Sequence, residues 1–81
     1  MEISEDELIG KSVISGKGFL IGVIKESVLD DTSGETTSVL VEPSKEIASR
    51  KYKFNEQGDI IFPFNSLVAV KDVIIVEESD L

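Results

Sequence analysis

The side chains that most often carry catalysis or bind metals are missing from this sequence. It has no histidine and no cysteine, so imidazole bases, thiol nucleophiles, disulfides and the usual zinc ligand sets are absent. A reaction would have to rest on carboxylates, lysine, tyrosine or hydroxyl groups. The composition therefore argues against an enzyme, and we predict no catalytic residue, no cofactor and no metal.

Two short motifs resemble binding sites but lack the spacing that those sites need. Asp30, Asp31 and Glu35 crowd one polar stretch, yet a calcium loop needs ligands at alternating positions and a bidentate glutamate about a dozen residues from its start. We interpret the stretch as a solvated hairpin tip. Gly16 and Gly18 lack the third glycine and the following helix of a dinucleotide site. They predict a tight turn.

A basic cluster alternates with aromatic residues. Half of the eight basic residues lie within nine positions: Lys45, Arg50, Lys51 and Lys53. Tyr52 and Phe54 could form a stacking platform for single-stranded nucleic acid. However, the formal charge of −8 repels phosphate backbones, and two aromatic residues of the same parity serve equally well as core. We predict core packing and no direct nucleic-acid contact. The basic side chains form either a solvated face or a docking site for an acidic partner.

The length and the distribution of charge indicate one small domain. No apolar run approaches the ~20 residues of a membrane span, and the acidic residues 1–7 are unlike a basic secretory signal. We expect a cytoplasmic protein without membrane insertion. Residues 1–7 are predicted to be a charged lead-in with one helical turn that begins at Ser4. Residues 8–77 are predicted to be the domain and residues 78–81 a polar tail.

One stretch organises the domain, an apolar strand over residues 18–30 that contains Gly22. Side chains alternate between the two faces of a strand. One parity carries Phe19, Ile21 and Val23, and the other carries Leu20, Ile24 and Val28. Both faces are apolar, so one lines the core and the other needs a second cover. Gly22 weakens a strand, and its presence suggests a bulge or a bend.

Further strand signals recur about every ten residues. They lie at residues 8–15, 37–42, 50–55 and 60–64 and in a final strand that ends at Val76. Short polar turns separate them, and no helix of three turns is indicated. This spacing predicts an all-β fold, an antiparallel sandwich or barrel.

Three motifs along these strands resemble a known family. Residues 8–13 read Leu-Ile-Gly-Lys-x-Val, residues 18–24 read Gly-x-x-Ile-Gly-Val-Ile, and Pro63 precedes Leu-Val-Ala-Val-x-Asp-Val-Ile-Ile at residues 67–75. Together they resemble the PRC-barrel domain, over about residues 8–77. The same domain occurs in the photosynthetic reaction-centre H subunit and in the ribosome-maturation factor RimM. The resemblance implies a strongly bent antiparallel barrel of about six strands that serves in docking and assembly, without catalysis.

The resemblance also implies roles for particular positions. Four residues match structural positions of the family: Gly10 in the first strand, Gly22 at the bend, Pro63 before the closing segment and Asp72 in the turn before the last strand. Lys71 departs from the pattern, because glycine is more usual there. The departure suggests an altered turn.

Within this family the chain resembles the small stand-alone archaeal members. Some are homodimers that act in cell division and bind SepF, which anchors the FtsZ ring to the membrane. We therefore expect a homodimeric adaptor that binds another protein, such as a SepF-like division protein. The alternative is a ribosome-associated factor similar to RimM, although this chain is acidic and lacks the extra N-terminal domain of RimM.

An excess of apolar residues supports an interaction surface. A small barrel has one interior, yet several strands are apolar on both parities. From parity we predict an outer apolar patch that forms a homodimer or receives a partner: Leu20, Ile24, Val28, Ile74 and Ile75. A bulge at Gly22 would switch the assignment of faces.

Overall fold

Six strands, one α-helical turn and one 3₁₀ turn make up the part of the chain that the computed structural model describes, residues 5–45, 47 and 52–76. Their bounds are α1 Glu5–Leu8, β1 Ser12–Ser15, β2 Leu20–Leu29, β3 Thr36–Pro43, β4 Ile60–Pro63, η2 (the 3₁₀ turn) Phe64–Ser66, β5 Leu67–Val70 and β6 Val73–Val76. The predicted all-β fold is confirmed.

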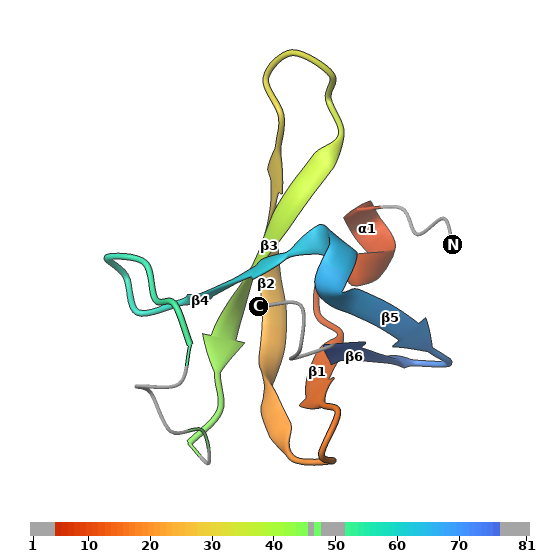
Figure 1. Ribbon diagram of the computed structural model, residues 1–81, viewed down its shortest axis with the longest axis vertical. Coiled ribbons are helices and arrows are strands. Elements are labelled where there is room, and N and C mark those ends of the chain that lie inside the picture. Colours follow the sequence, from red (N-terminus) through yellow and green to blue (C-terminus); the bar gives the residue numbers. More distant parts are fainter. Residues whose placement is uncertain (1–4, 46, 48–51, 77–81) are drawn as a thin grey trace.

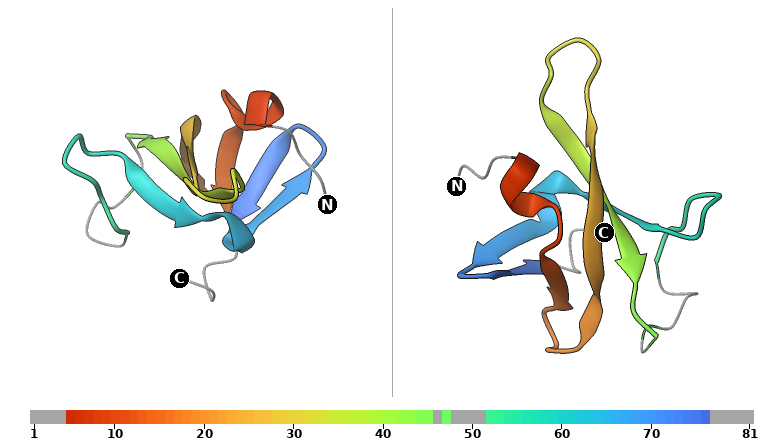
Figure 2. Two further views of the ribbon diagram at one scale, coloured as in Figure 1. Left: turned by 90° about the horizontal axis from the view of Figure 1, so that it is seen from above. Right: turned by 180° about the vertical axis from the view of Figure 1, so that it is seen from behind.

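The six strands form a single sheet in the order β4-β3-β2-β1-β6-β5. The two edge strands, β4 and β5, follow each other in the sequence, and only the three residues of η2 join them. Such a short connection requires the end of β4 and the start of β5 to lie close together, so the sheet must curl. Figure 2 shows the resulting half-barrel from above, and Figure 1 shows the β2–β3 hairpin extending beyond the other strands.

One pair of strands differs from the predicted antiparallel arrangement. β1 and β6 run parallel, with Val13 opposite Ile74, whereas the four other pairs of neighbouring strands are antiparallel. The reason is the β5–β6 hairpin, which reverses the chain once more before it reaches β1. Parallel neighbours need a long connection, and the segment from β2 to β5 provides it here.

Gly22 allows β2 to bend and to approach β3 closely. A Cβ atom at this position would collide with the carbonyl oxygen of Glu42 and would lie 2.9 Å from Cγ1 of Val41. Beside it, Val13 of β1 pairs with Gly22 while Ile14 pairs with Leu20, so Ile21 is an extra residue on β2. The bulge that the glycine suggested is therefore present.

Two of the predicted strands are shorter than expected. The first begins at Ser12 because Leu8 belongs to α1 and Gly10, with φ +89°, lies in a turn. The stretch predicted at residues 50–55 contributes one isolated bridge, from Phe54 to Ile60. Residues 50 and 51 lie outside the described residues, as do Ser4 and the predicted tail at residues 78–81.

The hydrophobic core lies on the inner face of the curled sheet. It consists of ten buried side chains: Leu8, Val13, Ile21, Ile24, Val39, Val41, Ile60, Phe62, Ile74 and Val76. Leu67 and Ala69 of β5 are partly buried and pack against this core. On the regular strands the core residues recur at every second position, as a pleated sheet with one buried face requires.

Candidate interaction surface

An apolar surface covers the outer face of β5, β6, β1 and the start of β2. The strand registers align eight outer residues in two rows across these strands. The first row is Val68, Ile75, Ile14 and Leu20, and the second is Val70, Val73, Ser12 and Val23. Seven of the eight are apolar, and none is charged. We call these eight residues the outer apolar surface.

The four residues at the ends of the two rows are the most exposed. Their exposed fractions are 38% for Leu20, 39% for Val23, 39% for Val68 and 43% for Val70. The four residues between them, on β1 and β6, are half-buried by their neighbours. Single exposed apolar residues are ordinary, but a contiguous apolar patch on a sheet usually marks an interface. The outer apolar surface is therefore the candidate functional site.

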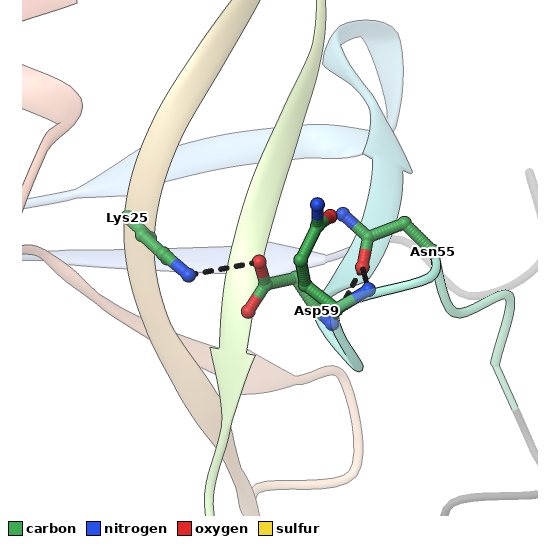
Figure 3. Close-up of polar contacts among 4 residues, drawn as sticks. Lys25, Asn55 and Asp59 are labelled. Atoms are coloured by element: carbon green, nitrogen blue, oxygen red, sulfur yellow. Dashed lines mark hydrogen bonds and ion pairs between the residues drawn. The ribbon is translucent and has the colours of Figure 1, made fainter.

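The other half of the outer face is mixed, because charged residues stand there beside the exposed Val28 and Ile61. The second row would continue from Val23 onto Glu42 of β3, which is exposed. Next to it, Lys25 donates a hydrogen bond of 3.0 Å from Nζ to Oδ2 of Asp59 (Figure 3). This hydrogen bond and then the charge of Asp59 raise the pKa of Lys25 above its ordinary value of 10.5. The lysine stays protonated at neutral pH, which makes it unsuitable as a nucleophile.

Asp59 is held by the hairpin turn before β4. Its N–H donates to Oδ1 of Asn55 at 2.9 Å, and the N–H of Asn55 donates to the carbonyl oxygen of Asp59 at 2.9 Å. Gly58 within this turn has φ +85°. The side chain of Asp59 is only 7% exposed. Lys25, Asn55 and Asp59 thus form a structural contact that ties β2 to the turn before β4 across β3 (Figure 3).

The structure corrects two of the five predicted interface residues. Ile24 and Ile74 were assigned to the outer face, but they are 1% and 0% exposed and belong to the core. The extra residue at Ile21 reverses the faces of β2, so Ile21 and Ile24, three positions apart, both point inward. A charged substitution at Ile24 would therefore disrupt the core. Ile74 pairs with the buried Val13, which fixes the inner face of β6.

The other three predicted interface residues do reach the surface. Leu20 is an exposed member of the outer apolar surface, and Ile75 is half-buried within it. Val28 is 38% exposed, but it lies on the projecting β2–β3 hairpin and outside the two rows. Leu29 beside it is also exposed, at 43%.

Sequence reasoning missed most of the outer apolar surface. Ile14, Val68, Val70 and Val73 were not nominated, and Val23 was assigned to the opposite face. The all-apolar stretch Leu67–Val70 was a usable signal, because a strand with apolar residues on both faces needs a cover on each. Its position beside β6, however, follows from the sheet order.

The polar stretch from Asp30 to Glu35 forms a turn that hydrogen bonds to its own backbone stabilise. Oδ1 of Asp30 accepts hydrogen bonds from the N–H groups of Thr32 at 2.7 Å and Ser33 at 3.0 Å. The bonds from Ser33 and then Thr32 lower the pKa of Asp30 below its ordinary value of 3.8. Glu35 closes the loop, since its carbonyl oxygen accepts the N–H of Asp30 at 2.8 Å. These contacts fit the predicted hairpin tip.

The aromatic residues of the basic cluster pack inward, as predicted. Tyr52 and Phe54 are partly buried against the core, and the ring of Tyr52 meets that of Phe62 edge to face, with centroids 5.4 Å apart. Lys45 and Lys53 are exposed. Arg50 and Lys51 lie outside the described residues. Because both rings already pack on the core, they do not form an exposed stacking platform.

The four residues assigned structural roles occupy turns, a bend and a strand end. Gly10 lies in the turn before β1, and Gly22 lies at the bend of β2. Pro63 is the last residue of the edge strand β4 and precedes η2. Asp72 shares the two-residue turn between β5 and β6 with Lys71, whose φ is +56°. Lys71 therefore adopts the left-handed conformation that glycine adopts most easily.

Neither a metal site nor a spanning helix occurs in the described part of the chain. No group of three or more acidic side chains there could hold a metal ion. None of its helices has the length and hydrophobicity to cross a bilayer.

Comparisons with known proteins agree with the half-barrel. The family model of the PRC-barrel domain matches residues 1–81, the whole chain. The chain is also similar to an uncharacterized protein of Methanocaldococcus jannaschii, with 35% identity over 75 residues. The matched region covers 91% of this chain and 80% of that protein.

Proposed function

The chain belongs to the PRC-barrel domain family, and from this premise we propose that it is a non-catalytic assembly module, which forms a homodimer and links it to another protein. The observation that carries the proposal is the outer apolar surface. Its two rows run across four strands without a charged residue, while acidic residues outnumber basic ones by 16 to 8 in the whole chain. Such a contrast favours a surface that is covered in the working protein.

A second copy of the chain is the first occupant that we propose for this surface. Fully burying a valine or leucine side chain contributes about 1.5–3 kcal/mol. The four end residues are about two-fifths exposed. Covering this exposed part of each side chain therefore contributes about 0.6–1.2 kcal/mol. Eight such residues in a dimer contribute about 5–10 kcal/mol. Against the lowest cost of association, about 4 kcal/mol, the net gain is at most about 6 kcal/mol, which corresponds to a Kd of about tens of micromolar. The expected dimer is therefore reversible.

The net charge of the chain opposes dimer formation, so the affinity of the dimer should depend on the salt concentration. Each copy carries a formal charge of −8, so two copies repel each other at low ionic strength. Added salt screens the repulsion and strengthens apolar association. The dimer is expected to become tighter as the salt concentration rises, whereas an interface built on ion pairs would weaken.

The test measures the mass in solution of three variants. The wild type is expected to approach twice 8.8 kDa at concentrations of about hundreds of micromolar, well above the expected Kd. Leu20→Lys and Val68→Lys, at the two ends of the first row, are expected to sediment as monomers. Leu29→Lys is the matched control, since it places the same charge at an exposed leucine outside the rows. A wild-type monomer, or equal loss of dimer in the control, would refute the proposal.

For the second partner we propose a SepF-like protein, which would give the chain a role in cell division. The support is the resemblance of its motifs to the stand-alone archaeal PRC-barrel proteins. The test is retention of a purified SepF-like protein by the immobilised chain, with Leu20→Lys and Leu29→Lys as the paired variants. If neither the wild type nor Leu29→Lys retains that protein, the role in cell division is wrong, whatever the outcome for the dimer.

A further inference from the structure

The two edge strands of the sheet, β4 and β5, differ in how well they are protected from pairing with another strand. At the β4 edge, the N–H of Ile61 donates to the carbonyl oxygen of Lys53 at 3.0 Å, Phe54 bridges to Ile60, and Pro63 ends the strand. Covering segments and proline are two devices by which proteins block unwanted strand pairing. The β5 edge has neither within the part of the chain that is described. Its four residues are Leu-Val-Ala-Val, and their pairing with β6 contains no bulge.

The backbone groups that β5 presents at this edge follow from its hairpin. Val70 pairs with Val73 across the two-residue turn, and the turn hydrogen bond joins those two residues. Hydrogen-bonded and non-bonded pairs alternate along an antiparallel ladder. Ala69 and Leu67 therefore direct their N–H and C=O groups away from β6. The N–H of Leu67 agrees with this alternation, because it donates to the carbonyl oxygen of Phe64 in η2.

In the described part of the chain, three backbone groups thus remain at the edge for another strand. They are the N–H and C=O of Ala69 and the C=O of Leu67. The side chains of these two residues pack on the core but are only partly buried. Apolar side-chain surface on the inner face of β5 therefore stays exposed at this edge. On the outer face Val68 and Val70 are 39% and 43% exposed. An added strand would extend the hydrogen-bonded ladder and lay side chains against both faces.

We propose that the β5 edge binds an extended, apolar segment of a partner protein that basic residues flank. Strand addition is a general mode of recognition, in which backbone bonds provide affinity and alternate side chains provide specificity. Charge selects the occupant. The chain has a formal charge of −8, which attracts a basic segment. The inference rests on the proposed adaptor role and names the chemistry of the partner.

The experiment uses the full chain and a labelled peptide with the sequence Lys-Lys-Val-Thr-Val-Thr-Val-Lys-Lys. Binding is followed by fluorescence anisotropy, and ¹⁵N NMR locates the site on the wild type. The expected result is a shifted Ala69 amide signal whose hydrogen exchange slows when the peptide is added. Replacing the flanking lysines by glutamates is expected to weaken binding at least about tenfold, because attraction becomes repulsion.

Ala69→Pro is the variant that removes the edge donor. The N–H of Ala69 does not bond to β6, so proline at this edge position leaves the β5–β6 ladder intact. The variant is expected to lose about tenfold or more in affinity for the peptide while circular dichroism and dimer mass stay unchanged. Leu20→Lys, on the outer apolar surface, is expected to keep peptide binding and to lose the dimer. The two variants thus separate the edge from the proposed dimer.

Each other result would overturn the inference. Shifts at Leu20 and Val23 with an unchanged Ala69 signal would assign the peptide to the outer apolar surface. Protection of the Ala69 amide that rises with protein concentration, without peptide, would assign the edge to a second copy. Equal affinity for the basic and acidic peptides would refute a basic partner, and no binding of either would refute strand addition. If Ala69→Pro does not fold, hydrogen exchange of the Ala69 amide in the wild type still shows whether the peptide binds at the β5 edge.

Discussion

Gly22 should be among the positions least tolerant of even a single added methyl group. In Gly22→Ala the new Cβ would collide with the carbonyl oxygen of Glu42 and lie 2.9 Å from both its carbonyl carbon and Cγ1 of Val41. Two of these three obstacles are backbone atoms, so β3 must move away from β2. Overpacking of this kind costs about 1–3 kcal/mol, and a backbone obstacle places the cost near the upper end.

One effect of the same substitution is favourable and must be subtracted. Alanine restricts the unfolded chain more than glycine does, which stabilises the folded state by about 0.4–1 kcal/mol. The net loss is then about 2 kcal/mol. A domain of this length has a total free energy of unfolding of about 4–12 kcal/mol, so the variant should lose between a sixth and a half of its stability.

Urea unfolding, followed by circular dichroism, measures this loss. With a slope of about 1 kcal/mol per molar urea for a small domain, the midpoint should fall by about 2 M. Gly16→Ala is the matched control, because its Cβ would meet only the carbonyl oxygen of Val76, at 3.8 Å, an ordinary contact. If both variants unfold at the same urea concentration, the close approach of β2 and β3 at Gly22 does not constrain the fold.

Two further predictions concern the β5–β6 turn and the contact of Lys25 with Asp59. Lys71→Gly should raise the free energy of unfolding by about 0.5–1 kcal/mol, because φ +56° strains a side-chain-bearing residue; a lower urea midpoint than the wild type would contradict this. Asp59→Asn should destabilise the protein in a pH-dependent way. The raised pKa of Lys25 means that its contribution is complete below pH 10.5 and is lost as the pH rises through the folded-state pKa. The difference in urea midpoint between wild type and Asp59→Asn should therefore be constant between about pH 7 and about pH 10 and shrink above it. A difference that persists to about pH 12 would show that the charge of Lys25 contributes nothing to it.

The sequence predicted those parts of the fold that local chemistry determines. Alternation and turn residues located β2, β3, β4 and the hairpin turns, because strand period and glycine conformations are local properties. The family motifs added the bent barrel. The parallel pairing of β1 with β6 was not predicted, since it depends on how many times the chain reverses between two distant strands.

The candidate site was harder to predict than the fold. The assignment of Ile24 to the surface assumed an unbroken period of two, and the extra residue beside Gly22 breaks that period. Val68 and Leu20 are far apart in the sequence, and they share a row only because β6 and β1 lie between their strands. Which strands are neighbours depends on the energy of the whole sheet and is not encoded in any one segment.

The pairing of the first strand with the last has a consequence for how the protein folds. The β2–β3 hairpin is local and can form early, whereas β1 and β6 come together only after the chain between them is in place. Loop-closure entropy makes such long-range pairing slow. We therefore expect a single cooperative refolding transition whose barrier lies in the joining of the two distant strands, and no fragment that lacks either one should hold the core together.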